Sequence, residues 1–217
     1  MTDERFAILT GGTAEFTERR SRFIAYTSSV SDEEEARAFL ARLKKEHYDA
    51  RHCCSAWILG ANGERQRSND DGEPGGTAGM PILEVLRRKR LTNAALAVVR
   101  YFGGIKLGAG GLTRAYAHAA ALGVASSRLA RRVTLRRVTV TVDYDLLSAV
   151  ESWARREGIR AEEPLFAERA TLRLLVEPDA EENILRAITD RTAGRAVIGD
   201  GGVEETLEPI ENDGAEP

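Results

Sequence analysis

Hydrophobic positions in the first part of the chain switch between strand spacing and helix spacing. Residues 5–9 and 22–30 have the strand character expected of β-branched and aromatic segments. Ser31 and Glu34 have the spacing of a capping box, and apolar residues then recur at helical spacing until about Glu46. The pattern therefore predicts two strands followed by a helix.

The middle of the chain predicts a hairpin, a loop and a buried strand. Residues 53–59 and 64–68 are typical of strands joined by a tight Asn-Gly turn. Residues 70–79 are rich in glycine and acidic side chains and are expected to form a loop. The uninterrupted apolar run at 94–102 is typical of a buried strand.

Two helices are expected around these segments. Pro81 suits the first position of a helix that ends near Lys89. After the apolar run, a glycine-rich loop at 103–111 leads into an alanine-rich helix that we expect from about Leu112 to Leu129. The first part of the chain thus interleaves strands and helices.

The remaining residues predict a regular order of elements. A strand, a helix, two strands, a helix and a strand are expected at 133–143, 146–157, 159–166, 170–176, 179–192 and within 196–207. This β-α-β-β-α-β order is the split βαβ arrangement of ferredoxin-like domains. We therefore predict an α+β protein with domains at residues 1–130 and 133–210 and a frayed tail at 211–217.

Composition indicates a soluble globular chain. Of its 217 residues, 42% are hydrophobic and 30% are charged, and no apolar run approaches the roughly 20 residues of a membrane-spanning helix. The N-terminus does not resemble a signal peptide, so we expect a cytoplasmic protein without a membrane partner. The adjacent Cys53 and Cys54 suit neither a disulfide framework nor a zinc site, so we expect reduced thiols, no metal and no cofactor.

The net charge of −3 hides an asymmetry. Residues 1–137 contain 23 Lys and Arg against 15 Asp and Glu, a net charge of +8. Residues 138–217 contain 8 against 19, a net charge of −11. Opposite signs indicate two units with different partners, or two units that attract each other. We expect the basic part to contact phosphates and the acidic part to contact a protein.

The first candidate site is the glycine-rich loop before the alanine-rich helix. A glycine loop at a helix start leaves backbone N–H groups free and lets an anion approach closely. We expect Lys106 and Arg114 to add positive charge beside the glycines of this loop, Gly108, Gly110 and Gly111. Neither a Walker A loop nor a complete G-x-G-x-x-G motif is present. The alternative is a tight strand-to-helix connection whose glycines only satisfy backbone geometry.

Aromatic and basic residues extend this candidate site. Arg100 with Tyr101, Phe102 and Tyr116 gives a mixture that binds single strands by charge and stacking, although aromatic residues at strand ends also suit a core. The basic run at 87–90 either complements a helix dipole or widens a phosphate-binding surface.

The acidic loop is the second candidate site. It offers carboxylates and a hydroxyl at Asp70, Asp71, Glu73 and Thr77. Three roles are open: a structural turn, a metal or catalytic site, or recognition of a partner or of Arg100 or Arg114. His52 shares a strand face with Cys54, but a separation of about 6 to 7 Å is too long for a nucleophile and its base.

Several stretches resemble the IMPACT family in its bacterial, YigZ-type form. They are SRFI at 21–24, RH at 51–52, DDGEPGGTAG at 70–79, and VRYFGG, GAGGL and RAY between residues 99 and 116. The last two regions are specific because they fix many residues in order and spacing. The similarity covers essentially the whole chain.

This resemblance implies a fold for each domain. The N-terminal domain would share the fold of domain 2 of small-subunit ribosomal protein five, of domain IV of elongation factor G, and of sugar and mevalonate kinases. The C-terminal domain would be ferredoxin-like, as in domain V of elongation factor G. Eukaryotic relatives regulate translation under amino-acid starvation with an extra N-terminal interaction domain, and we do not transfer that mechanism.

The leading hypothesis is a non-enzymatic regulator of translation. It would bind RNA, ribosomal components or a translation-factor partner through a basic groove of the N-terminal domain. Arg100, Lys106, Arg114 and the loops at 70–79 and 103–111 would line this groove. The alternatives are an enzyme that acts on a phosphorylated small molecule and a pure protein-interaction module.

Overall fold

The computed structural model describes residues 5–210 and divides them into two compact units. The first unit comprises residues 5–132 together with 207–210, and the second comprises residues 133–206. The tail at 211–217, for which fraying was predicted, lies outside the described residues. No helix between residues 5 and 210 is long and apolar enough to cross a membrane. The chain is a two-domain protein of mixed α and β structure.

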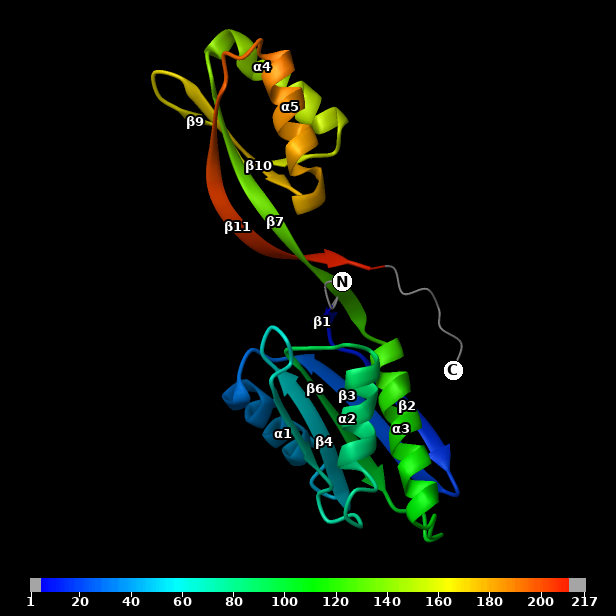
Figure 1. The fold of residues 1–217 in the computed structure, drawn as a ribbon. Coiled ribbons are helices and arrows are strands. Elements are labelled where there is room, and N and C mark those ends of the chain that lie inside the picture. The colour runs from blue at the N-terminus through cyan, green and yellow to red at the C-terminus, as the bar shows by residue number, and fades with distance from the viewer. Residues whose placement is uncertain (1–4, 211–217) are drawn as a thin grey trace. The chain divides into compact units, whose positions relative to one another are not determined.

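The first unit is built on a five-stranded antiparallel sheet with the order β2-β3-β6-β4-β5 (Figure 1). In that order the strands span Thr13–Glu18, Ser21–Ser29, Ala94–Tyr101, His52–Leu59 and Arg65–Asn69. A separate strand, β1 (Phe6–Thr10), pairs antiparallel with the first residues of β7 (Arg128–Val142). The central strand β6 is buried on both faces, which explains its continuous apolar run.

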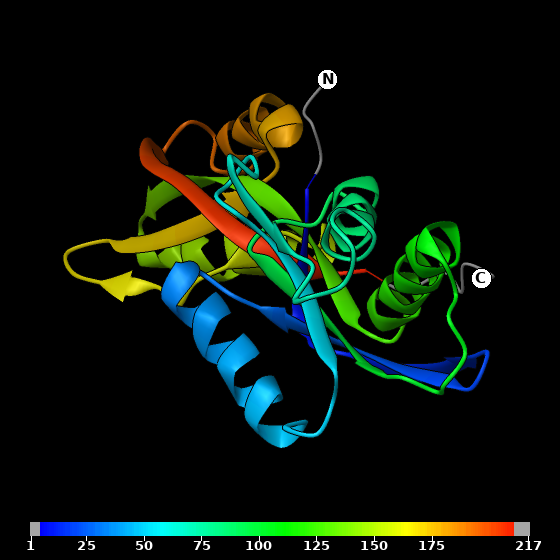
Figure 2. The same ribbon diagram turned by 90° about the horizontal axis from the view of Figure 1, so that it is seen from below.

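Helices cover both faces of this sheet (Figures 1 and 2). Helix α1 (Glu33–Glu46) packs on one face, and α2 (Gly79–Arg88) and α3 (Ala109–Ala125) pack on the other. Side chains alternate along β4, so Trp57 joins the apolar cluster beneath α1 while Ala56 joins the cluster beneath α2 and α3. The alternation therefore produces two cores, one on each side of the sheet.

The second unit has the predicted β-α-β-β-α-β order. After β7 its elements are α4 (Tyr144–Arg156), β8 (Arg160–Ala161), β9 (Leu165–Phe166), β10 (Ala170–Val176), a 3-10 turn (Pro178–Ala180), α5 (Glu181–Arg191) and β11 (Val197–Pro209). Strand β10 pairs with β7 and β8, and β11 pairs with β7. The sheet order β11-β7-β10-β8 and the two helices make this unit ferredoxin-like.

Some predicted boundaries are wrong, each for a local reason. The strand expected at 159–166 is two short strands, because Pro164 lies between them and has no N–H for the ladder. Helix α3 ends at Ala125 rather than Leu129, because the following residues enter β7. The domain boundary predicted near residue 130 is not among the wrong ones: the second unit begins at residue 133, and β7 continues from the first unit into the second.

The cap of α1 lies one residue later than predicted. The Asp32 carboxylate accepts a hydrogen bond of 2.9 Å from the Glu35 N–H. In return, the Glu35 carboxylate accepts a hydrogen bond of 2.7 Å from the Ser31 N–H. Asp32 is therefore the N-cap in place of Ser31, and the return bond of Glu35 goes to the N–H of the residue before the cap and not to that of the cap itself, as a capping box would require.

Strands β2 and β3 are joined by a turn of two arginines. Glu18 pairs with Ser21, so the turn consists of Arg19 and Arg20, whose φ angles are 46° and 66°. Positive φ at both central positions is the geometry of a type I′ turn, which favours Asn-Gly. The sequence did not predict β2, because no typical turn residues separate it from β3.

Replacing the two arginines of this turn with an Asn-Gly pair tests whether they are strained. We expect the R19N/R20G variant to raise the free energy of unfolding by about 1 kcal/mol, because the left-handed conformation is unfavourable for bulky L-residues. Urea denaturation measures the difference. A loss of stability would show that contacts of the two arginines outweigh the backbone strain.

Candidate functional site

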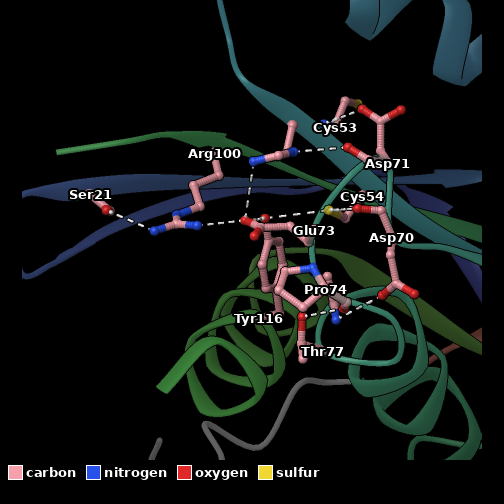
Figure 3. A network of polar contacts seen from close by, with 12 residues as sticks. Ser21, Cys53, Cys54, Asp70, Asp71, Glu73, Pro74, Thr77, Arg100 and Tyr116 are labelled. Atoms are coloured by element: carbon pink, nitrogen blue, oxygen red, sulfur yellow. Dashed lines mark hydrogen bonds and ion pairs between the residues drawn. The ribbon is translucent and has the colours of Figure 1, made fainter. Parts of the chain in front are cut away.

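Three residues lie side by side on the sheet face that α2 and α3 cover. Arg100, near the end of β6, is in register with Phe23 of β3 and with His52 of β4. Residues directly opposite each other in a sheet point to the same face. The row lies at the end of the sheet where β4 begins and β6 ends. Arg100 there lies beside Glu73 of the loop at 70–79 (Figure 3).

The guanidinium of Arg100 is buried and forms an ion pair with Glu73 of the loop. Arg100 is 4% exposed, and its Nη1 donates a hydrogen bond of 2.6 Å to Glu73 Oε1. The Tyr116 hydroxyl of α3 donates a bond of 2.9 Å to the same oxygen, and His52 Nε2 lies 3.7 Å from it. Arg100 Nη2 also donates to Ser21 Oγ at 3.3 Å. The Glu73 carboxylate thus joins the loop to β6 and to α3 (Figure 3).

Two aromatic rings flank the same guanidinium. The central carbon of the Arg100 guanidinium lies 5.4 Å from the ring centres of both Phe23 and Phe102. Within residues 5–210, Arg100 Nε is buried without a hydrogen-bond partner. Burial raises the pKa of Tyr116, so its hydroxyl remains protonated and available to donate to Glu73. The Arg100 side chain is therefore enclosed by protein groups.

Asp70, the first residue of the loop, binds the backbone of the last residues of the loop. One carboxylate oxygen accepts hydrogen bonds from the N–H groups of Ala78 (3.0 Å) and Gly79 (2.8 Å), and the other accepts from Gly76 (2.8 Å). Burial opposes ionisation of Asp70, but these three donors outweigh it and hold its pKa below the usual value. Since the helix α2 begins at Gly79, Asp70 caps this helix from outside its own turn.

Asp71 attaches the loop to the start of β4. Its carboxylate accepts a bond of 2.7 Å from the Cys53 N–H and one of 2.6 Å from Lys44 Nζ. Its carbonyl oxygen lies 2.9 Å from His52 Nδ1. Thr77 turns inward and donates to the Pro74 carbonyl oxygen at 2.7 Å.

The acidic loop therefore combines two of the roles left open by the sequence. Asp70 and Asp71 organise a turn, and Glu73 recognises Arg100. Among residues 5–210, no group of three or more His, Cys, Asp or Glu side chains is placed to hold a metal ion.

The two cysteines are buried next to this network. Cys54 Sγ lies 2.9 Å from the Asp70 carbonyl oxygen and 3.3 Å from the Tyr116 hydroxyl oxygen. Burial raises the pKa of Cys53 to about 11 and raises that of Cys54 further. Because the thiolate is the nucleophile, neither cysteine is activated for chemistry at neutral pH.

The predicted anion-binding residues fall into a buried group and an exposed group. Arg100 and Tyr116 are buried, so the prediction that they line an open groove does not agree with their position. Lys106 and Arg114 are exposed, and in the described part of the chain neither forms an ion pair. The exposed glycines Gly108 and Gly110, with the partly exposed Gly111, lie between these two cations.

Gly108 is the N-cap of α3 and provides no side chain to satisfy the first turn of the helix. Its φ is 73°, a left-handed value that glycine adopts without strain. At Gly111, an added Cβ would approach Leu107 Cβ to 3.0 Å, so the loop packs closely on the helix there. Both the binding role and the close-connection role predicted for these glycines remain compatible with this geometry.

Some residues of this region were not predicted as site residues. Ser21 accepts hydrogen bonds at its Oγ from Arg100 Nη2 and, at 3.2 Å, from the Gly103 N–H. A Cβ on Gly103 would lie 2.0 Å from the Arg20 carbonyl group, so the chain approaches the β2–β3 turn closely. The only signal in the sequence was the presence of Ser21 in a family-like stretch.

The geometry defines a two-domain class: a helix-covered antiparallel sheet with an acidic loop whose Glu73 is buried, followed by a ferredoxin-like domain. The Impact N-terminal domain model matches residues 19–124, and a model described as Domain of unknown function (DUF1949) matches residues 140–195. The chain is 38% identical over 201 residues to IMPACT family member YvyE of Bacillus subtilis, covering 93% of each chain. This chain therefore belongs to the IMPACT family.

Solved structures give a similar result. One titled "Crystal structure of an hypothetical protein" has 27% identity and a TM-score of 0.59, and covers 98% of this chain and 100% of its own. Another, titled as the two-domain translational regulator Yih1, has 29% identity over 54% of this chain and 47% of its own, with a TM-score of 0.39. The first structure is therefore similar to this chain over both domains. The TM-score of the second is too low to indicate the same arrangement.

The Glu73→Gln variant tests the buried ion pair. Glutamine keeps the shape of the side chain but leaves the charge of Arg100 unbalanced, so we expect the free energy of unfolding to fall by about 3 kcal/mol. The control is Glu84→Gln, which removes a half-exposed pair with Arg87 and should cost about 1 kcal/mol or less. Equal losses in urea denaturation would contradict a special role for Glu73.

The Asp70→Asn variant tests the cap on α2. At about pH 7 we expect a loss of about 1–2 kcal/mol, because asparagine cannot accept from all three N–H groups. The pKa of Asp70 is lowered by folding. The advantage of the wild type is therefore present above the unfolded-state pKa and shrinks as the pH falls through the folded-state pKa. Denaturation curves between about pH 7 and pH 3 measure it; a difference independent of pH would contradict this origin.

Proposed function

We propose that this protein regulates translation by binding RNA through one exposed surface of its first domain. We call this the glycine-loop surface; it consists of Arg51, Phe102, Lys106, Gly108, Gly110 and Arg114. The observation that supports the proposal most directly is that Lys106 and Arg114 are exposed and form no ion pair within residues 5–210. Unpaired cations beside accessible backbone N–H groups favour phosphate contacts.

An exposed aromatic ring lies beside Arg51, another cation of this surface. Phe102 is 40% exposed, and the central carbon of the Arg51 guanidinium lies 6.0 Å from its ring centre. Ile105, in the same loop, is 41% exposed. Exposed aromatic rings beside cations are the combination with which proteins bind single strands without strict sequence preference. Single-stranded RNA is therefore the partner that this surface favours.

The buried network gives the surface a fixed base. Phe102 and Gly103 follow directly after β6, where Arg100 is bound to Glu73 and to Ser21. The Gly103 N–H also bonds to Ser21 Oγ. The loop thus leaves the sheet from an anchored position, and a fixed binding surface loses less entropy when it meets a partner.

Family membership supports the choice of translation as the process. The resemblance to IMPACT proteins implies it, since eukaryotic members regulate translation. We infer regulation of translation for this protein as well, but not the mechanism of those relatives, which uses a further domain. The acidic charge of residues 138–217 favours a protein contact for the second domain, alongside RNA contact by the first.

Removing both exposed cations tests the proposal. For the full chain with a short single-stranded RNA, we expect the K106A/R114A variant to bind more weakly. The slope of log K against log salt should fall by about 1.4, since each phosphate contact to a single strand contributes about 0.7. Fluorescence anisotropy at several salt concentrations gives the slope.

The control removes two exposed cations elsewhere, in the K45A/R156A variant, and should leave the slope unchanged. Wild-type protein without salt-dependent RNA binding, or a K106A/R114A slope equal to that of wild type, would contradict the proposal. Co-sedimentation with ribosomes before and after nuclease treatment separates RNA contact from protein contact: binding that survives nuclease would favour a protein partner.

A further inference from the structure

A pocket of about 250 Å³ lies between β2 and the first turns of α3. Its charged and titratable lining residues are Glu18, Arg19, Arg114 and His118, and its walls include Phe16 and Leu107. Only Arg114 is shared with the glycine-loop surface. His118 also comes from α3, whereas Glu18 and Arg19 come from β2 and the β2–β3 turn, far from α3 in the sequence.

The pocket has an excess of positive charge. Arg19 Nε lies 3.9 Å from Glu18 Oε1, with side chains that are 59% and 50% exposed, so water screens this pair. Arg114 has no ion pair in the part of the chain that the structure describes. Two guanidinium groups therefore face one weakly engaged carboxylate, and an anion is the complementary ligand.

Side chains from α3, β2 and the β2–β3 turn line the same pocket. Arg114 and His118 are four residues apart on α3 and so project from the same face of the helix. The His118 ring packs edge-on against Phe16 of β2, with ring centres 4.8 Å apart. The imidazole is thus placed against the opposite wall, while Arg19 enters from the turn.

We propose that this pocket binds a phosphate monoester. Arginine matches phosphate oxygens with paired hydrogen bonds, and two arginines suit the charge of a monoester, which is about −1.5 to −2 at neutral pH. An internal phosphodiester of RNA has a single negative charge and two ester substituents, and suits this pocket less well.

The size of the pocket limits the ligand. Its volume of about 250 Å³ is below the roughly 300–1,000 Å³ of sites that enclose a drug-sized molecule. The pocket therefore takes the phosphate and its nearest atoms rather than a whole nucleotide. Two sources present this chemistry: the 5′-phosphate at the end of an RNA strand, and a phosphorylated small molecule. Only the first source rests on the proposed function.

Two matched pairs of probes test the inference with the full chain. The first pair is one short RNA with a 5′-phosphate and the same RNA with a 5′-hydroxyl, compared by fluorescence anisotropy. The second pair is adenosine monophosphate and adenosine, compared by thermal shift. We expect the phosphorylated member to bind about tenfold more tightly in at least one pair, because only this member can form charge-assisted hydrogen bonds between its phosphate and the two arginines.

The variants Arg19→Gln and Arg20→Gln separate the pocket from its surroundings. Both keep a polar side chain at a positive-φ position of the same turn, but only Arg19 lines the pocket. We expect Arg19→Gln to abolish the preference for the phosphate and Arg20→Gln to retain it. Lys106→Ala, outside the pocket lining, should weaken both RNAs equally.

The outcomes distinguish this inference from the proposed function. A preference confined to adenosine monophosphate, lost in Arg19→Gln, supports the pocket even where RNA does not bind. RNA binding without a preference in either pair overturns the pocket and leaves the proposed function intact. A preference that Arg19→Gln retains also overturns the assignment of this pocket.

Discussion

The ion pair between Arg100 and Glu73 is the interaction on which the structure around the candidate site depends. Both side chains are removed from water, so the charge of each is balanced by the other. Through Tyr116 and Ser21 the pair connects the acidic loop to α3 and β3 as well as to β6. Removal of one member of such a pair leaves the other charge buried without a partner and lowers stability, so the pair holds the loop in place.

The consequence is that two kinds of cation occur in the first domain. Arg100 is bound to an internal partner and acts on the surface only by positioning the chain that follows it. Lys106 and Arg114, a short distance further along the chain, are exposed and unpaired within residues 5–210. The excess of positive charge in the first part of the sequence is therefore accessible to a partner only at the residues that the fold leaves in water. Arg19 is also exposed, with a weak ion pair to Glu18, in a turn where another residue type would fit the backbone better.

The features predicted best from the sequence are those set by local patterns. The apolar run predicted as a strand at 94–102 became the central strand β6 at 94–101, and the order of elements in the second unit followed from their periodicity. The strand β2 was missed because its turn contains two arginines instead of Asn-Gly. The position of Arg100 was difficult to predict, because its burial depends on a carboxylate that is distant in sequence and is placed by the fold. The pocket was missed for the same reason, since Arg19 and His118 meet only through the packing of α3 on β2.

A double-mutant cycle on the ion pair tests this dependence most directly. The single variants Glu73→Gln and Arg100→Gln and the double variant are compared with wild type in urea denaturation of the full chain. Because each single variant leaves one buried group without its partner, we expect the two losses to be non-additive, with a coupling free energy of about 2 kcal/mol or more. Additive losses, within about 0.5 kcal/mol, would show that the two side chains stabilise the domain independently and would contradict the central role of their ion pair.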